Sequence, residues 1–465
     1  MRALPPPGRL LLAAAVLGPL AGPAAAQEFP RTGVMLTFDV SQRLEVDSNL
    51  DLDVASPGTS TVATTRLDFG LRSETGTRTL VFGAAAALRA FDVPTRSDHV
   101  DIDNPDLRLS YTREGAGSLI EFSARYIRSD ITFIRPLADS LGDPDIPDLL
   151  VDLDDLRGGG WREDHILSAR LETGTDGPLG FAVSAAYLNR DYEDTTNPDL
   201  TDILTRSVSA EARLAFSPVT TGTVRASFTR DTDYDVTTER TDTTTLMLGL
   251  AHEFSPVLRL SAELGPTWVR SEDGGTVTRE EGIDGALLLT RALANGEIGL
   301  GLSADTDEDG TTTRLSVSRS LELPEGTLSG SFGVARGPDG NTELVGGLDY
   351  SQAMPYGTVE ATLLRDVTFS DDDGDETRTE FAIGYVFPLT GASSLGIGAS
   401  TSRLDNSDTG ERETRTNLGL TYSYALDDRW GLNIGYRHRL RDEGLGEARS
   451  DVAFLTIRRH FDGGW

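Results

Sequence analysis

The sequence contains no cysteine and no lysine, and beyond its first residues it has no long apolar segment. The absence of cysteine excludes disulfides, thiolate metal sites and cysteine nucleophiles, and it suits a chain that crosses an oxidising compartment unfolded. All side-chain positive charge at neutral pH therefore comes from arginine. No segment after the N-terminus approaches the roughly 18 consecutive apolar residues that a transmembrane helix requires. The sequence thus excludes a bundle of membrane-spanning helices.

Charge of one sign dominates, because 74 acidic residues outnumber 42 basic ones and give a formal net charge of -32. Such a chain repels phosphate backbones, so we expect no nucleic-acid partner. There is no G-x-S-x-G, Walker or Rossmann sequence, and the five histidines lack the spacing of metal ligands. The sequence therefore predicts no enzymatic activity, no catalytic residue and no cofactor.

The N-terminus has the organisation of a secretory signal peptide. Arg2 and Arg9 precede an apolar run over 10–20, and alanines at 24–26 provide the small residues of a cleavage site. We expect residues 1–26 to be removed and residues 27–465 to form the mature protein. A retained inner-membrane anchor is the alternative, which the shortness of the apolar run disfavours.

What the chain does have is an apolar residue at every second position, in segment after segment. From Val34 to Val46, for example, apolar side chains alternate with polar ones such as Asp39 and Arg43. A strand with this period buries one face and wets the other. Because no helical pattern separates the strands, lipid is the natural partner for so many apolar faces. The sequence predicts an all-β fold, a transmembrane antiparallel up-and-down β-barrel of about 22 strands (range 18–22) with no plug domain.

The connections alternate between short turns and longer loops rich in aspartate. Pro324-Glu-Gly is one of the short turns, whereas 231–242 and 271–280 are two of the expected long loops. Outer-membrane barrels have short periplasmic turns and longer extracellular loops. Aromatic residues next to these connections, such as Phe228 and Trp268, fit girdles at the membrane interfaces. We therefore expect the outer membrane of a Gram-negative bacterium, with both termini in the periplasm.

The polar positions of the strands carry many charges of both signs. A dry core could not hold them, since each unpaired charge would cost several kcal/mol, so we expect a wet lumen. Arginine–carboxylate ladders that stabilise the wall, a polar conduit for solutes, or both together would explain this face. The predicted lumen-lining charged residues are Arg66, Asp68, Arg72, Arg108, Glu121, Arg125, Arg170, Glu172, Arg213, Arg225, Arg259, Glu263, Arg314, Arg378 and Arg437.

Arg319 conflicts with this scheme, because it shares the apolar positions of Val317 and Leu321. A lipid-facing arginine at mid-membrane would cost roughly 2–4 kcal/mol. Either a bulge shifts the register there, or the arginine lies away from the middle of the membrane.

The longest loop, 129–164, is the third of the long set and is acidic. It is similar to the third extracellular loop of general porins, which folds into the lumen, in loop order and acidity. One hypothesis is therefore a constriction opposite wall arginines, and a solvated outer loop is the equal alternative. The constriction residues would be Asp143, Asp145, Asp148, Asp152, Asp154 and Asp155.

One shorter loop resembles the opening of an EF-hand calcium loop, with Asp305, Asp307 and Asp309 at alternate positions. The twelfth position is Ser316 instead of a bidentate glutamate, and no flanking helices are expected. These aspartates are weak calcium candidates, and we assign no metal site.

The signal, the even number of strands and the Ser-Pro turns resemble bacterial outer-membrane β-barrels of the porin type, including the family called β-barrel porin 2. TonB-dependent transporters also have 22 strands but carry an N-terminal plug, whereas the first strand here starts soon after the predicted cleavage site. That difference argues against active uptake. The last strand resembles the aromatic-ended signal that barrel-assembly machinery reads, with Leu455, Ile457 and Phe461 at alternate positions.

The expected function is a passive, porin-like channel for small hydrophilic solutes. One alternative is a barrel accessory to exopolysaccharide or lipid export, and another is a surface structural protein without transport. The expected partners are small hydrophilic solutes, outer-membrane lipid and lipopolysaccharide, and the barrel-assembly machinery.

Overall fold

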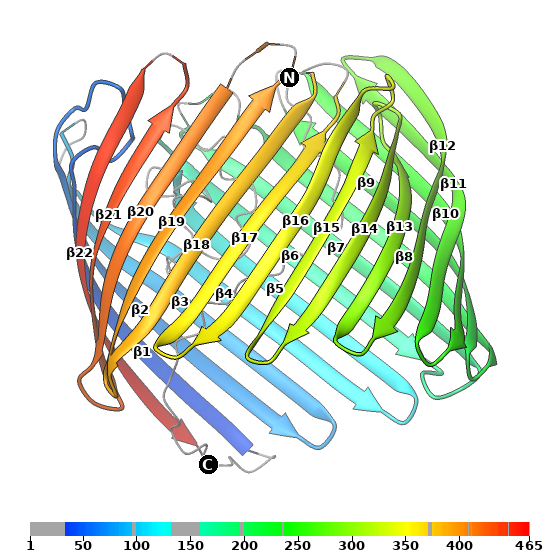
Figure 1. Cartoon of the computed structure of the whole chain (residues 1–465), viewed down its shortest axis with the longest axis horizontal. Helices are drawn as coiled ribbons and strands as arrows, with labels where there is room; N and C mark the ends of the chain where they lie inside the picture. Colours follow the sequence, from blue (N-terminus) through cyan, green and yellow to red (C-terminus); the bar gives the residue numbers. More distant parts are fainter. Residues whose placement is uncertain are drawn as a thin grey trace.

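A computed structural model describes residues 33–94, 99–131, 159–195, 197, 200–234, 237–370, 374–407, 409–410, 412–444 and 446–464. The predicted signal peptide and the six predicted constriction aspartates lie outside these residues. The described chain is all β, with 22 strands in one sheet that closes into a barrel (Figure 1). The prediction of an all-β antiparallel barrel is confirmed, at the upper end of the expected strand count.

The strands follow one another around the wall in chain order, each antiparallel to the next. Their bounds are β1 Gly33–Asp47, β2 Ser60–Thr75, β3 Arg78–Asp92, β4 His99–Gly115, β5 Ser118–Asp130, β6 Trp161–Thr173, β7 Leu179–Glu193, β8 Asp202–Ser217, β9 Thr220–Tyr234, β10 Thr238–Ser255, β11 Leu258–Asp273, β12 Thr276–Leu293, β13 Gly296–Thr306, β14 Thr311–Leu323, β15 Gly326–Arg336, β16 Thr342–Met354, β17 Gly357–Thr368, β18 Glu376–Thr390, β19 Ser393–Asn406, β20 Arg412–Ala425, β21 Trp430–Asp442 and β22 Glu447–Gly464.

The barrel closes because β1 pairs with β2 on one side and with β22 on the other. The β1–β22 register runs unbroken from Met35 opposite Gly464 to Asp47 opposite Val452. A closed sheet has no edge, so the backbone N–H and C=O groups of the wall find partners within it. This closure is what allows so polar a chain to present an apolar outer face to lipid.

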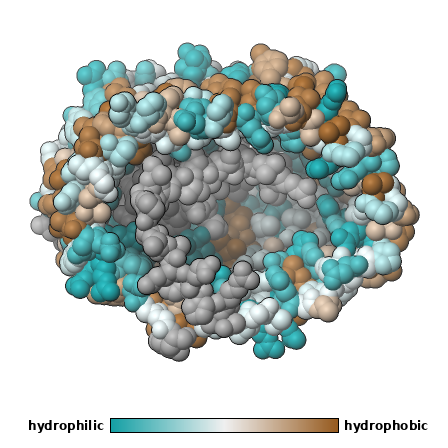
Figure 2. Space-filling view, turned by 60° about the horizontal axis from the view of Figure 1, so that its bottom comes forward, coloured by the Kyte–Doolittle hydropathy of each residue, from teal (hydrophilic) through white to brown (hydrophobic). Residues whose placement is uncertain are grey.

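The two faces of the wall follow the sequence alternation. Large apolar side chains stay exposed at every second position, for example Phe38, Leu67 and Leu264, which is 61% exposed. Their exposure is expected of a surface that meets lipid. Seen obliquely from the short-turn end, the wall surrounds a hollow (Figure 2). The charged positions of the same strands therefore face that hollow.

Two of the expected long loops are tight connections in the structure. Strands β9 and β10 extend until only 235–237 separates them, and β11 and β12 until only 274–275 does. The predictions of long loops at 231–242 and 271–280 are therefore wrong. Threonine, arginine and aspartate fill these strand ends, so the apolar alternation that marks a strand is lost there although the hydrogen-bonded ladder continues.

Arg319 lies toward the short-turn end of β14, and its Nη2 donates to Oδ1 of Asn295 at 2.8 Å. Asn295 belongs to the short connection between β12 and β13. Neither neighbour of β14 shows a register shift, so no bulge turns Arg319 inward. The side chain instead reaches along the wall to the membrane boundary, as long arginine side chains do when they snorkel.

Within the described residues, no helix is long and apolar enough to cross a membrane, a finding that concerns helices alone.

A buried ion pair spans the seam between the first and last strands. Arg439 of β21 and Asp47 of β1 are 1% and 0% exposed, and their side chains lie 2.6 Å apart. Arg439 also donates to the Ser450 hydroxyl at 3.1 Å and to the Asn49 carbonyl at 3.2 Å. The Ser450 hydroxyl in turn hydrogen-bonds Asp47. Three strands meet in this seam network.

Replacing Asp47→Ala should lower the free energy of unfolding by about 3–5 kcal/mol, because Arg439 would remain buried without its carboxylate. The midpoint of urea unfolding and the temperature of the heat-dependent gel shift would report the loss. As a control, Arg72→Gln removes an exposed partner of Glu74 and should cost less than about 1 kcal/mol. Equal midpoints for the two variants would contradict a stabilising seam network.

Candidate functional site: the inner wall

All the predicted lumen-lining residues lie on the inner face of the wall, at positions that alternate with exposed apolar side chains. Many form short ladders with a carboxylate nearby. Arg225 is typical: it lies 2.9 Å from Glu211 and 3.5 Å from Glu263. The other pairs of this kind are Arg66–Asp68, Arg72–Glu74, Arg170–Glu172, Arg259–Glu253, Arg314–Asp366 and Arg378–Glu380, with Glu121 opposite Arg170 in the register.

The remaining predicted residues differ from these ladders. Arg213 donates to the carbonyl oxygens of Gly174 and Thr175 in the connection after β6. Arg437 stands on β21 opposite Gly419 of β20. Arg108 and Arg125 belong to the cluster described next.

The first half of the cluster surrounds Asp106 of β4, which is 3% exposed. Arg108 lies 2.5 Å and Arg125 lies 2.9 Å from its carboxylate. The Arg108 side chain is 54% exposed, whereas that of Arg125 is 14% exposed. One buried carboxylate thus holds two guanidinium groups, of which Arg108 is the more open to the hollow.

The second half surrounds Asp164 of β6, which is 1% exposed. Arg162 lies 2.9 Å and Arg190 lies 2.8 Å from its carboxylate. Arg162 is itself 1% exposed, and neither of its two terminal nitrogens has a hydrogen-bond partner among the described residues. A buried guanidinium with two unmet donors is energetically costly.

The register brings the two halves together. Asp106 lies opposite Ile127, Ile127 opposite Asp164, and Asp164 opposite Arg190, so one lateral row crosses β4 to β7. We call Asp106, Arg108, Arg125, Arg162, Asp164 and Arg190 the inner arginine cluster. It gathers four guanidinium groups and two carboxylates on the inner wall of a strongly acidic chain.

Four members of this cluster were missed by sequence reasoning, namely Asp106, Arg162, Asp164 and Arg190. The available signal was an arginine and an aspartate two residues apart on the polar positions, as in Asp106/Arg108 and Arg162/Asp164. That spacing places both side chains on the same face of a strand. It does not reveal that the two pairs occur at matching heights on β4 and β6, with β5 between them.

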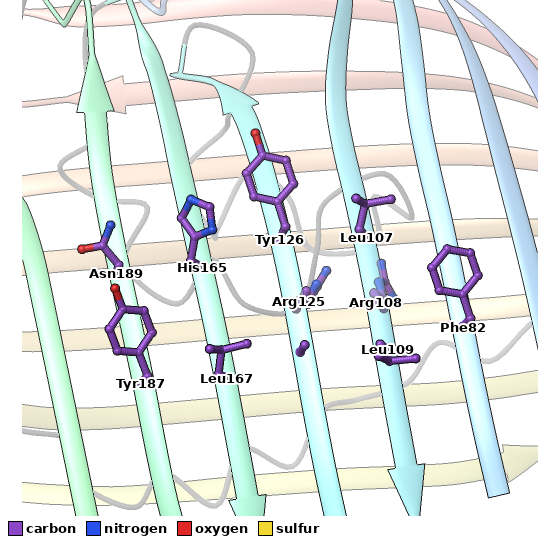
Figure 3. Close-up of a pocket in the computed structure, with 11 residues that line it drawn as sticks. Phe82, Leu107, Arg108, Leu109, Arg125, Tyr126, His165, Leu167, Tyr187 and Asn189 are labelled. Carbon is purple, nitrogen blue, oxygen red and sulfur yellow. The ribbon is translucent and has the colours of Figure 1, made fainter.

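A separate groove of about 430 Å³ lies on the outer face, across β3 to β7 (Figure 3). In this view the apolar and aromatic side chains stand in front of the strands, and Arg108 and Arg125 lie behind them. The outer residues that line it are Phe82, Leu107, Leu109, Ala124, Tyr126, His165, Leu167, Tyr187 and Asn189. This groove belongs to the lipid-facing surface and not to the hollow.

The calcium candidates do not converge. Asp305 is on β13, whereas Asp307 and Asp309 are in the connection 307–310, where the Asp307 side chain accepts hydrogen bonds from the backbone of Asp309 and Gly310. Among the residues that the structure describes, no three histidine, aspartate or glutamate side chains are placed to hold a metal ion.

The fold and the inner wall define a 22-stranded outer-membrane β-barrel. No protein-family model matches the chain, and no curated protein matches it. Solved structures do resemble it. A variant of the ferric enterobactin receptor from Pseudomonas aeruginosa, in complex with enterobactin, aligns over 93% of this chain and 82% of its own, with a TM-score of 0.57 and 10% identity.

Two further structures are similar. The ferric-catecholate import receptor Fiu from E. coli K12 aligns over 92% of this chain and 81% of its own, with a TM-score of 0.56 and 10% identity. The FrpB iron transporter from Neisseria meningitidis aligns over 93% and 82%, with a TM-score of 0.57 and 8% identity. At such low identity the likeness shows the fold, an outer-membrane β-barrel.

These neighbours correct the expected function. They are import receptors and a transporter, not passive channels, so the predictions of a porin-like channel, an export accessory and a non-transporting surface protein are wrong. The resemblance to β-barrel porin 2 is likewise not supported, since no family model matches. The expectation of no enzymatic activity agrees with these three structures, which are two receptors and a transporter.

The acidic connection 307–310 should make stability depend on pH. The pKa of Glu308 is raised from 4.5 to about 7. Burial is the main cause, and the negative charges of Asp307, Asp309 and Glu239 also contribute to this shift. Because the folded pKa exceeds the unfolded one, the stability contribution is complete below 4.5 and is lost as pH rises to about 7.

We therefore expect the urea midpoint of the wild type to fall between pH 4.5 and pH 7 by more than that of Glu308→Gln, which cannot titrate at this position. Asp428→Asn, in the short connection between β20 and β21, is the matched control and should keep the wild-type slope. A Glu308→Gln profile parallel to the wild type would refute the assignment.

Proposed function

We propose that this chain is an outer-membrane import receptor for a small anionic ligand of the ferric-siderophore class. The observation that carries the proposal is the inner arginine cluster, in which two buried aspartates each hold two arginines. Its support is the combination of this cluster with a wall of 22 strands similar to those of ferric enterobactin and ferric-catecholate receptors.

The charge of the ligand follows from the charge of the cluster. Three catecholate groups carry more negative charge than a ferric ion neutralises, so such a complex is an anion. Guanidinium groups bind oxyanions with two parallel hydrogen bonds, and they lose less hydration than an ammonium group does. The four guanidinium groups of the inner arginine cluster are therefore suited to a ligand whose oxygens spread its negative charge over a broad surface.

The position of the inner arginine cluster favours a ligand that enters the barrel from the loop end. Asp164 is near the start of β6 and Arg190 near the end of β7, and both of these strand ends adjoin the longer connections. The more open Arg108 lies one inward-facing position further from the loop end of β4 than Asp106. A ligand that enters past the loops meets this part of the inner wall before it reaches the ladders nearer the short turns.

Arg108→Gln should weaken binding of a ferric catecholate siderophore about tenfold or more, because one charge-assisted hydrogen bond to the ligand is lost. Asp106 keeps Arg125 as a partner in this variant, so the wall should remain folded. Binding would be measured by tryptophan fluorescence quenching of the purified barrel, and import by uptake of radioactive iron as the siderophore complex.

Arg225→Gln is the matched control. It removes the same charge from the same face, but from a group in which two glutamates surround one arginine, so binding should be unchanged. Absence of saturable binding by the wild type across catecholate, hydroxamate and carboxylate siderophores would refute the proposed function. An equal loss in both variants would refute the role of the cluster.

A further inference from the structure

A lateral row of arginines crosses the outer face of the barrel near its loop end. The register places its members side by side on five successive strands, β8 to β12. In order around the wall they are Arg206, Arg230, Asp242, Arg270 and Arg279. Four guanidinium groups and one carboxylate thus occupy one row, which we call the outer arginine row.

The row faces away from the hollow. One outward-facing position closer to the middle of the wall, the register aligns Val208 with Phe228, and further along it includes Trp268. Val208 is 47% exposed and Trp268 is 42% exposed, as expected of side chains that meet lipid. The same row also contains Thr244 and ends at Glu281, and its aromatic side chains place the arginine row just beyond it at the height of lipid headgroups.

The row contains like charges with too few partners. Arg206 lies directly opposite Arg230, and Arg270 directly opposite Arg279, an arrangement that is destabilising without a counter-ion. Arg230 is 2.6 Å from Asp242, and Arg270 is 3.0 Å from Glu272, so one member of each pair has a carboxylate partner. Arg206 and Arg279 are both exposed, and neither makes an ion pair or hydrogen bond with any residue that the structure describes. An anion placed beside Arg206 and Arg279 would supply the counter-charge that these two arginines lack.

The outer groove adjoins this row. Tyr187, which lines the groove, lies opposite Arg206 in the register. From there the same lateral row continues through Leu167 and Ala124 to Leu109 and Phe82 (Figure 3). The apolar groove and the arginine row are therefore two parts of one continuous surface.

Strand tilt places the two parts at different depths. The strands are steeply inclined in the wall (Figure 1), so a row at right angles to them changes height around the barrel. Arg206 lies near the loop end of β8, whereas Phe82 lies near the short-turn end of β3. The surface thus descends from charged side chains at headgroup height to apolar side chains at acyl-chain height.

We propose that this surface binds a lipopolysaccharide molecule of the outer leaflet. Its phosphate groups lie along the outer arginine row, between Arg206 and Arg279, and one of its acyl chains occupies the outer groove. Charge complementarity and the step from charged to apolar side chains match a phosphate-bearing lipid with several chains.

Arg128, on the other side of the outer groove, differs from the exposed arginines of the outer arginine row. Arg128 is 3.1 Å from Glu163 and 3.1 Å from Glu193, and it stacks on the Trp161 ring. Two carboxylates therefore neutralise its charge. This contrast places the phosphate groups toward β8 to β12.

The test uses full-length chain expressed in a Gram-negative host, extracted from the outer membrane in mild detergent, with bound lipopolysaccharide counted by native mass spectrometry. The wild type should retain lipopolysaccharide. Arg206→Gln combined with Arg279→Gln should retain about tenfold less or lower still, since two charge-assisted contacts are lost. Neither residue has an ion pair to break, so the heat-dependent gel shift should stay at its wild-type temperature.

The matched control is Arg78→Gln combined with Arg113→Gln. These arginines are also opposite one another and exposed on the outer face, but at the short-turn end. The control should retain lipopolysaccharide at the wild-type level. Ala124→Trp, which fills the groove without changing charge, should reduce retention, and lysine at positions 206 and 279 should preserve most of it.

Four outcomes would overturn the proposal. The first is wild-type retention in the glutamine variant of the outer row, and the second is an equal loss in the short-turn control. The third comes from delipidated barrel offered purified lipopolysaccharide or phosphatidylglycerol: equal affinity for both would show a surface for any anionic lipid. Loss of retention together with a change in oligomeric state would assign the surface to a second copy of the chain and also overturn it.

Discussion

The structure depends on one constraint, that backbone polar groups in a membrane must hydrogen-bond within the protein. Closure of β1 on β22 satisfies it, and the alternating faces follow from it. Because every strand is paired with two neighbours, successive side chains point alternately into the hollow and into lipid. Charged and apolar residues are therefore separated by the wall itself, and each face can be built for a different partner.

The same register organises arginine differently on the two faces. Inside, Asp106 and Asp164 are buried and each fixes two arginines, which holds positive charge rigidly at one part of the wall. Outside, Arg206 and Arg279 are exposed at the two ends of their row without a partner among the described residues. Pre-positioned guanidinium groups favour a ligand of defined shape, whereas open ones favour a partner that supplies its own counter-charge.

Much of the fold is readable from the sequence, because a period of two residues is a local property. The strand count, the inner positions of residues such as Arg225, and the conflict at Arg319 all follow from it. The segments 231–242 and 271–280 were wrongly predicted as loops, because the strands there continue through residues that no longer alternate with apolar ones. The inner arginine cluster needed the register between strands, which no local pattern encodes. The prediction of a passive channel was wrong because the solved structures with a similar fold are only 10% identical to this chain, so the sequence alone did not reveal the likeness.

The seam network has a consequence for assembly. Arg439 and Asp47 are 392 residues apart, so their contact forms only when the last strands meet the first and the barrel closes. Until then each is a charge without its partner, and a partly built wall is correspondingly unfavourable. The seam network therefore stabilises the closed barrel and does not stabilise intermediates in which the barrel is still open.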